Sequence, residues 1–207
     1  MLIPKRLDTS ITGRMADARG AFNAGAFMSA ISLLLTLPDV CGCRLYPGTG
    51  SKEHYVKWFD EYVAPAYLGP GLDNYDSRKI QEPDTGCVSY TTSYFTGADC
   101  YQLRCVYLHE GTNAPHRSTS FHAIQFRVFD CVSDNWPGGC NHLGQTKSDD
   151  GEEFLQVDLD LGYFIKHMED GIGRFLVEHP EMNEDHGSDS YLYQPILDFR
   201  SGVAKNM

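Results

Sequence analysis

The sequence predicts a mainly α-helical protein, a helical bundle with a small inserted two-stranded β-hairpin. Apolar residues recur at helical spacing near both ends of the chain, over residues 13–36 and 161–178. Residues 119–129, which lie between them, alternate between apolar and polar side chains, and this is the period of a β-strand. Helices on both sides of a short β segment therefore indicate a bundle that carries an insertion.

One domain is expected. The chain has 207 residues, of which 42% are hydrophobic and 22% charged, and this is enough apolar material for one sizeable core. The domain spans residues 1–207, with a bundle core at about 13–113 and 160–180, the hairpin insertion at about 119–159 and an acidic C-terminal tail from residue 181.

The first predicted helix covers residues 13–36, and Ser10 or Thr12 is placed to cap its start. Its apolar stripe consists of Phe22, Ala26, Phe27, Ala30, Ile31, Leu34 and Leu35. Pro38 and Gly42 are expected to end it, because proline disfavours the helical conformation in the preceding residue and glycine permits the turn out. A loop is expected to follow.

The most apolar stretch of the chain, residues 24–40, overlaps this helix. Ser29, Ser32 and Thr36 interrupt it, so we interpret it as a buried core helix that is too short and too mixed to span a bilayer. The first residues lack the long apolar core of a secretory signal. We expect a cytoplasmic protein with no membrane partner.

The middle of the chain predicts further helices. Residues 51–66 form one, with Tyr55, Trp58, Phe59 and Tyr62 as its stripe. Helical character returns near 88–95 and is clear over 98–108. The stripe of this last segment is Leu103, Val106 and Tyr107.

The predicted hairpin joins strands at 119–129 and 153–159 through a loop at 131–151 that is rich in Gly, Pro, Asn and Asp. Asp160 then caps the last helix, over 161–178. The core face of that helix is Phe164, Ile165, Met168, Ile172, Phe175 and Leu176.

The formal net charge is −11 and the pI is near 5.0. This balance argues against a broad surface that tracks phosphates, because such a surface needs clustered Lys and Arg. It leaves room for a small pocket built from a few arginines. The acidic surface is interpreted first as a solubility feature.

The chain has an odd number of cysteines and no expected secretory signal, so free thiols are predicted. They are Cys41, Cys43, Cys87, Cys100, Cys105, Cys131 and Cys140. The alternative is a metal site formed by Cys131, Cys140 and His142, which share one Gly/Pro-rich stretch. We expect neither a metal nor a cofactor.

The candidate catalytic residues are Arg104 and His109, in the segment LRCVYLHEG. The chain lacks the Walker loop, GxGxxG, HExxH and GxSxG motifs, so several common enzyme classes lose support. On a helix the two side chains lie about 140° apart, and both reach one pocket if the helix ends near His109. Gly111 favours such an end.

An arginine followed five residues later by a histidine (R-x4-H) near a helix end resembles the signature of HEPN-domain proteins of toxin and phage-defence type. The resemblance covers about residues 13–113 and the last helix. It implies a metal-independent endoribonuclease that acts as a homodimer, with two such motifs forming one composite site. It further implies that His109 is the acid/base and Arg104 the phosphate clamp, with RNA as substrate and an antitoxin or other protein as partner.

Two alternatives stand beside this hypothesis. Arg117–His122 and Arg174–His179 have the same spacing, although the first pair runs into a strand. In the non-catalytic interpretation Arg104 pairs with an acid such as Asp39 or Glu110, and His109 ends a helix favourably. The chain would then be a helical module for protein interaction or oligomerisation, in which exposed aromatic side chains anchor the interface.

Overall fold

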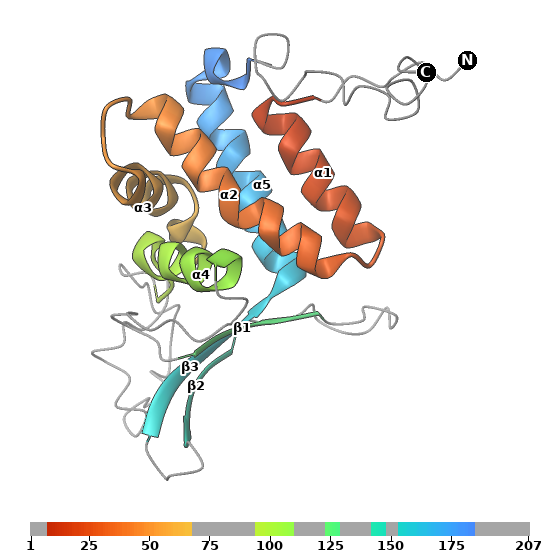
Figure 1. Ribbon diagram of the computed structural model, residues 1–207, viewed down its shortest axis with the longest axis vertical. Helices are drawn as coiled ribbons and strands as arrows, with labels where there is room; N and C mark the ends of the chain where they lie inside the picture. Colours follow the sequence, from red (N-terminus) through yellow and green to blue (C-terminus); the bar gives the residue numbers. More distant parts are fainter. Residues whose placement is uncertain (1–7, 68–93, 110–122, 129–141, 148–152, 185–207) are drawn as a thin grey trace, which may run out of the picture.

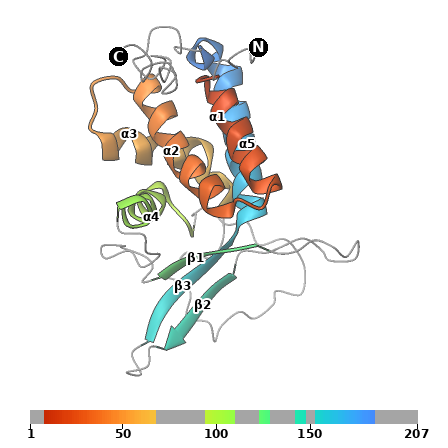
Figure 2. The same ribbon diagram turned by 45° about the vertical axis from the view of Figure 1, so that its right-hand side comes forward.

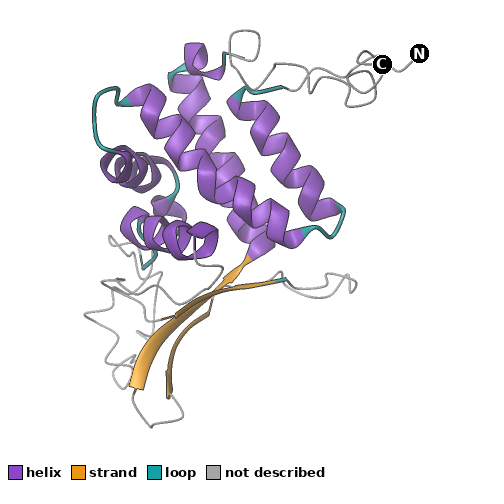
Figure 3. Ribbon diagram, viewed as in Figure 1, coloured by secondary structure: helices purple, strands orange, loops and turns teal. Residues whose placement is uncertain are grey.

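The computed structural model describes residues 8–67, 94–109, 123–128, 142–147 and 153–184. Helices dominate this part of the chain, and a small sheet extends from one end of the helical layer (Figures 1 and 3). The predicted mainly α-helical fold is confirmed.

The predicted helix at 13–36 is in fact two helices, α1 (Ile11–Asn23) and α2 (Phe27–Leu45). Gly25, with φ of +74°, makes the break in a left-handed conformation that glycine adopts without steric cost. Two hydrogen bonds close the turn, from Gly25 N to Phe22 O and from Ala26 N to Ala21 O. This is the Schellman arrangement that ends many helices. Ser10 caps α1, as expected, by accepting from the Gly13 N–H.

Helix α2 continues through Pro38, so the prediction that Pro38 ends the helix is wrong. A proline inside a helix removes one backbone donor and costs about 3 kcal/mol or more. Burial of the surrounding turns offsets that cost. The buried residues of α2 are Ala30, Ile31, Leu34, Leu35, Leu37, Pro38, Cys41 and Gly42. In the turn before the proline, the Tyr55 hydroxyl donates to the Leu35 carbonyl oxygen at 3.1 Å.

Because α2 runs on to Leu45, it is long and apolar enough to cross a membrane by length and composition. The sequence prediction was wrong on that point. The expected core helix is nevertheless confirmed, since α2 packs against α1, α3, α4 and α5. It is the one helix of this kind in the described residues, so they give no support to a protein that crosses a membrane several times.

Helix α3 (Ser51–Tyr62) is followed by the short 3₁₀ helix η1 (Ala64–Tyr67), which together match the helix predicted at 51–66. Helix α4 (Gly97–His109) matches the one predicted at 98–108. Most of the helix predicted at 88–95 lies outside the described residues. Figure 2 shows α3 and α4 on one side of α2, and α1 and α5 on the other.

Helix α5 (Leu161–Glu178) has the predicted bounds. Asp160 caps it by accepting from the Tyr163 N–H at 2.8 Å. The 3₁₀ helix η3 (Pro180–Asn183) follows, and the rest of the predicted acidic tail lies outside the described residues. The buried face of α5 consists of Leu161, Phe164, Ile165, Met168, Gly171, Ile172 and Phe175.

The sheet differs from the predicted hairpin. Strands β1 (Ala123–Arg127) and β3 (Glu153–Asp160) lie side by side but run parallel. A third strand, β2 (His142–Lys147), falls within the predicted loop and pairs antiparallel with β3, so the order is β1-β3-β2. Strand β2 was not predicted because its sequence, HLGQTK, has one large apolar residue and therefore no alternating pattern.

The core between α3, η1 and α5 is aromatic. Trp58 stacks on Tyr62 with ring centroids 5.6 Å apart, and Phe175 meets both edge-on. Phe59 and Tyr67 continue the cluster. Such rings bury large areas and gain further from offset and edge-to-face contacts. They fix α3 against α5, and hence the position of the first turns of α3 beside α2.

The crossing of α2 and α3 gives a first testable prediction. A Cβ on Gly42 would lie 2.4 Å from the His54 carbonyl oxygen, whereas a Cβ on Gly20 of α1 would meet nothing within 4 Å. We expect Gly42→Ala to lower the free energy of unfolding by about 1–3 kcal/mol through overpacking. Gly20→Ala should raise it by up to about 1 kcal/mol through helix propensity. Urea denaturation of both variants measures this, and equal effects would contradict the crossing.

Candidate functional site

Arg104 lies on α4 at the junction with α2 and α3, and its side chain is 17% exposed. Its Nη2 is 3.5 Å from Asp39 Oδ2. The guanidinium carbon is 5.9 Å from the ring centroids of both Tyr55 and Tyr101, within the range of a cation–π contact. The pairing with Asp39 that the non-catalytic interpretation expected is therefore present.

These contacts leave the guanidinium of Arg104 incompletely satisfied. A separation of 3.5 Å is at the outer limit of a hydrogen bond, and the Nε of Arg104 is buried without an acceptor among the described residues. A guanidinium carries five N–H donors in a rigid fork. Arg104 is thus oriented by a carboxylate and two rings, and the described residues do not satisfy all of its donors.

His109 is the last residue of α4, and its side chain lies outside the described part of the structure. Gly111, which was predicted to end this helix, lies outside the described residues. Arg104 therefore lies more than one helical turn before His109, which is the last described residue of α4. The contact of the two side chains with one pocket stays a prediction.

The carboxylate of Asp39 is the centre of the site. Its Oδ1 accepts from Ser51 Oγ at 3.1 Å and lies 2.9 Å from His54 Nε2, while its Oδ2 faces Arg104. His54 is nearly enclosed, with 9% of its side chain exposed. Helices α2, α3 and α4 each supply at least one member of this network. The close approach at Gly42 is what brings the His54 turn against α2.

The tyrosines around Arg104 are packing and donor groups rather than bases. Burial raises the pKa of Tyr55 well above its ordinary value, and the Arg104 charge opposes this only in part. Burial, followed by the neighbouring Cys105 thiol, raises the pKa of Tyr101. The two rings meet edge-on at 5.3 Å. Both hydroxyls therefore stay protonated at neutral pH, and the rings hold the guanidinium in place.

His54 and Ser51 were not predicted as site residues, and Asp39 appeared only as a possible ion-pair partner. The available signal was local: Ser51 and His54 are three residues apart and so share a helix face. That spacing by itself is also typical of a weak helix cap. This helix face meets Asp39 because α2 continues beyond Pro38, where the sequence predicted that the helix would end.

The competing R-x4-H pairs have different surroundings. On α5, an Arg174 guanidinium nitrogen donates to the carbonyl oxygen of Tyr62, and His179 packs near the Phe175 ring at 5.5 Å. The Arg174 hydrogen bond joins the end of α5 to α3. Arg117 and His122 lie outside the described residues.

Within the described ranges, no group of three or more His, Cys, Asp and Glu side chains is placed to hold a metal ion. Cys131 and Cys140, of the alternative metal site, lie outside those ranges. The described cysteines Cys41, Cys43, Cys100 and Cys105 are free thiols. Burial raises the pKa of the Cys100 thiol to about 12, so it is not a nucleophile at neutral pH.

Comparison of the chain with protein families, with curated proteins and with solved structures gives no match.

The Asp39 network gives a second testable prediction. Asp39→Ala removes the acceptor of Ser51 and the partner of both His54 and Arg104, leaving polar groups half-buried or buried. We expect the free energy of unfolding to fall by about 1–3 kcal/mol. Asp170→Ala, which breaks the exposed pair with Lys166 on α5, should cost less than about 0.5 kcal/mol. The prediction is wrong if chemical denaturation gives both variants the same stability.

Proposed function

We propose that this chain is a metal-independent endoribonuclease of the HEPN type, with Arg104 binding the scissile phosphate and His109 transferring protons. The observation that carries the proposal is the state of Arg104. Its guanidinium is oriented by two tyrosine rings and a distant carboxylate, the described residues do not satisfy all of its donors, and 17% of its side chain is exposed. An oriented, partly exposed arginine stabilises the negative charge that develops on a phosphate during transesterification.

The proposed chemistry uses a nucleophile that RNA itself contains. The 2′-oxygen forms a bond to the adjacent phosphorus, and the bond from phosphorus to the 5′-oxygen breaks. One proton leaves the 2′-hydroxyl and one is delivered to the 5′-oxygen, so the products are a 2′,3′-cyclic phosphate and a free 5′-hydroxyl. Histidine suits both transfers because its pKa lies near neutrality. In a homodimer, His109 of each copy would supply one of them.

Asp39 and His54 are assigned a positioning role. The Nε2 of His54 is engaged with Asp39, and the side chain is nearly enclosed, so it is not placed to meet a polymer. Asp39 offsets the charge of Arg104 and fixes its direction without forming a close bidentate pair. A close pair would compete with phosphate for the same donors.

The alternative, a non-catalytic interaction or oligomerisation module, is favoured by one observation, the Arg104–Asp39 ion pair itself. Its other basis was exposed aromatic residues, and these are scarce among the described residues. The large hydrophobic side chains exposed in the described part are Met28, Val128 and Val177, none of them aromatic. Tyr55, Trp58 and Phe59, from the predicted stripe, are fully buried. We therefore favour the ribonuclease.

The third testable prediction concerns cleavage. The purified chain should cut single-stranded RNA in EDTA and leave 2′,3′-cyclic phosphate ends, which are resolved by mass spectrometry. Arg104→Ala should lower kcat by about 100-fold or more, as the loss of one charge-stabilising donor does. His109→Ala should lower it by about 100- to 10,000-fold, the contribution of one general acid or base.

A matched control comes from the same chain. His179 occupies the equivalent place in the R-x4-H spacing on α5, and His179→Ala should leave cleavage unchanged. The ribonuclease proposal fails if the wild-type chain cuts no RNA in EDTA, or if Arg104→Ala and His109→Ala cut as fast as wild type. A chain that cuts nothing but sediments as a defined oligomer, disrupted by Asp39→Ala, would support the interaction module.

A further inference from the structure

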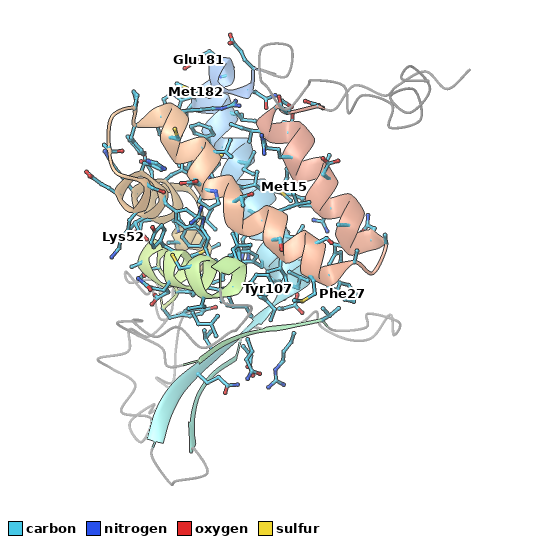
Figure 4. All side chains as sticks on the ribbon, in the orientation of Figure 1. Met15, Phe27, Lys52, Tyr107, Glu181 and Met182 are labelled. Atoms are coloured by element: carbon cyan, nitrogen blue, oxygen red, sulfur yellow. The ribbon has the colours of Figure 1, made fainter. Side chains whose placement is uncertain are left out.

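An open groove with a volume of about 760 Å³ lies between the first turns of α3 and the side of α4. Its lining includes Val56 and Tyr101, which make it mainly apolar, and Lys52 and Lys57 on the α3 side. Figure 4 shows Lys52 at the outer side of α3, away from α1 and α5. The volume is in the range of small-molecule sites, so one nucleotide would fit.

The groove adjoins the Arg104 network at two residues. Tyr101 lines the groove and also lies beside the Arg104 guanidinium, with 5.9 Å between its ring centroid and the guanidinium carbon. Ser51 lines the groove and donates to Asp39. A polymeric ligand bound in the groove would thus continue past Tyr101 to Arg104.

The side chains that line the groove carry a net positive charge, whereas the whole chain is acidic. Lys52 and Lys57 both line it, against one carboxylate, Glu53, while the whole chain carries a net charge of −11. The ammonium of Lys57 is held 3.9 Å from the ring centroid of Tyr46. Among the described ion pairs, neither lysine is paired with a carboxylate. The groove therefore combines an apolar floor with two cations in an otherwise acidic protein.

We propose that this groove binds one nucleobase of single-stranded RNA next to the scissile phosphate, with Tyr101 packed against the base and Lys52 and Lys57 on the flanking phosphates. The proposal rests on the proposed ribonuclease function and names its substrate-binding subsite. An apolar base with flanking charged phosphates matches an apolar floor with two lysines along its α3 side, whereas an acidic peptide would leave the floor unfilled. Stacking of bases on aromatic rings and lysine contacts to the backbone are the usual means of holding single strands.

The fourth testable prediction uses a probe that cannot be cut. A fluorescein-labelled, mixed-sequence 2′-O-methyl hexanucleotide has no free 2′-hydroxyl, so anisotropy measures binding alone. Tyr101→Leu should weaken binding about 5- to 150-fold, the usual effect of losing one stacking ring, while Tyr101→Phe should bind as wild type does. In the double variant Lys52→Ala/Lys57→Ala, the slope of log Kd against log salt should fall by about 0.7 for each lysine.

Two controls make the result specific. Lys166→Ala removes an exposed lysine of α5 and should change neither affinity nor salt slope. An abasic oligonucleotide of the same length should bind more weakly than the hexanucleotide and should not respond to Tyr101→Leu. If the abasic strand binds equally well, or if the Tyr101 and lysine variants all bind as wild type does, the groove is not a nucleobase site and the proposal is overturned. Thermal unfolding of Tyr101→Leu shows whether the fold is kept.

Failure of this proposal is distinguishable from failure of the ribonuclease. If wild type cuts RNA in EDTA while the groove variants bind the hexanucleotide normally, the groove assignment is wrong and the ribonuclease stands. If wild type binds the hexanucleotide through the groove but cuts no RNA, the groove assignment stands and the catalytic role is wrong. Absence of any binding by wild type overturns the groove assignment directly.

Discussion

The continuity of α2 through Pro38 is the constraint on which the rest of the molecule depends. Helices α1, α3, α4 and α5 all pack against α2, and its turns around the proline are buried. Had the helix ended at Pro38, Asp39 would have left the bundle in a loop. Because it continues, Asp39 faces α3 and α4 at a fixed place, and Gly42 lets the His54 turn approach closely. The helical packing and the polar site therefore share one cause.

Two kinds of interaction stabilise the molecule in different places. The aromatic cluster of Trp58, Tyr62 and Phe175 joins α3 to α5 mainly through ring packing, and its stabilisation scales with buried area. The Asp39 network joins α2, α3 and α4 through charged and polar contacts at partial burial. Half-buried ion pairs contribute little net stability because desolvation offsets attraction, although removal of one partner alone is costly because the other is left unpaired. The network is better understood as fixing the direction of Arg104 than as a source of stability.

The separation of the aromatic core from the polar Asp39 network bears on how this protein could contact RNA. An acidic chain repels a polyanion at long range, so any contact with RNA must come from a few local cations rather than from the field of the whole protein. Arg104, Lys52 and Lys57 lie around one groove and one network, and Tyr101 belongs to both. The proposed substrate contact is accordingly short, one base with the scissile and flanking phosphates, and its dependence on ionic strength comes from these few charges alone.

The sequence by itself determined the elements whose signals are local. The bounds of α5 follow from the period of its apolar residues and from the Asp160 cap, and the mainly helical class follows in the same way. Gly25 also carried a local signal, which a continuous apolar stripe concealed. Only the tertiary structure decided that α2 passes Pro38, that β1 pairs in parallel with β3, and that Arg104 meets Asp39, 65 residues away in the chain. The physical reason is that each of these depends on burial or pairing against a distant segment, and such energies leave no periodicity in the segment itself.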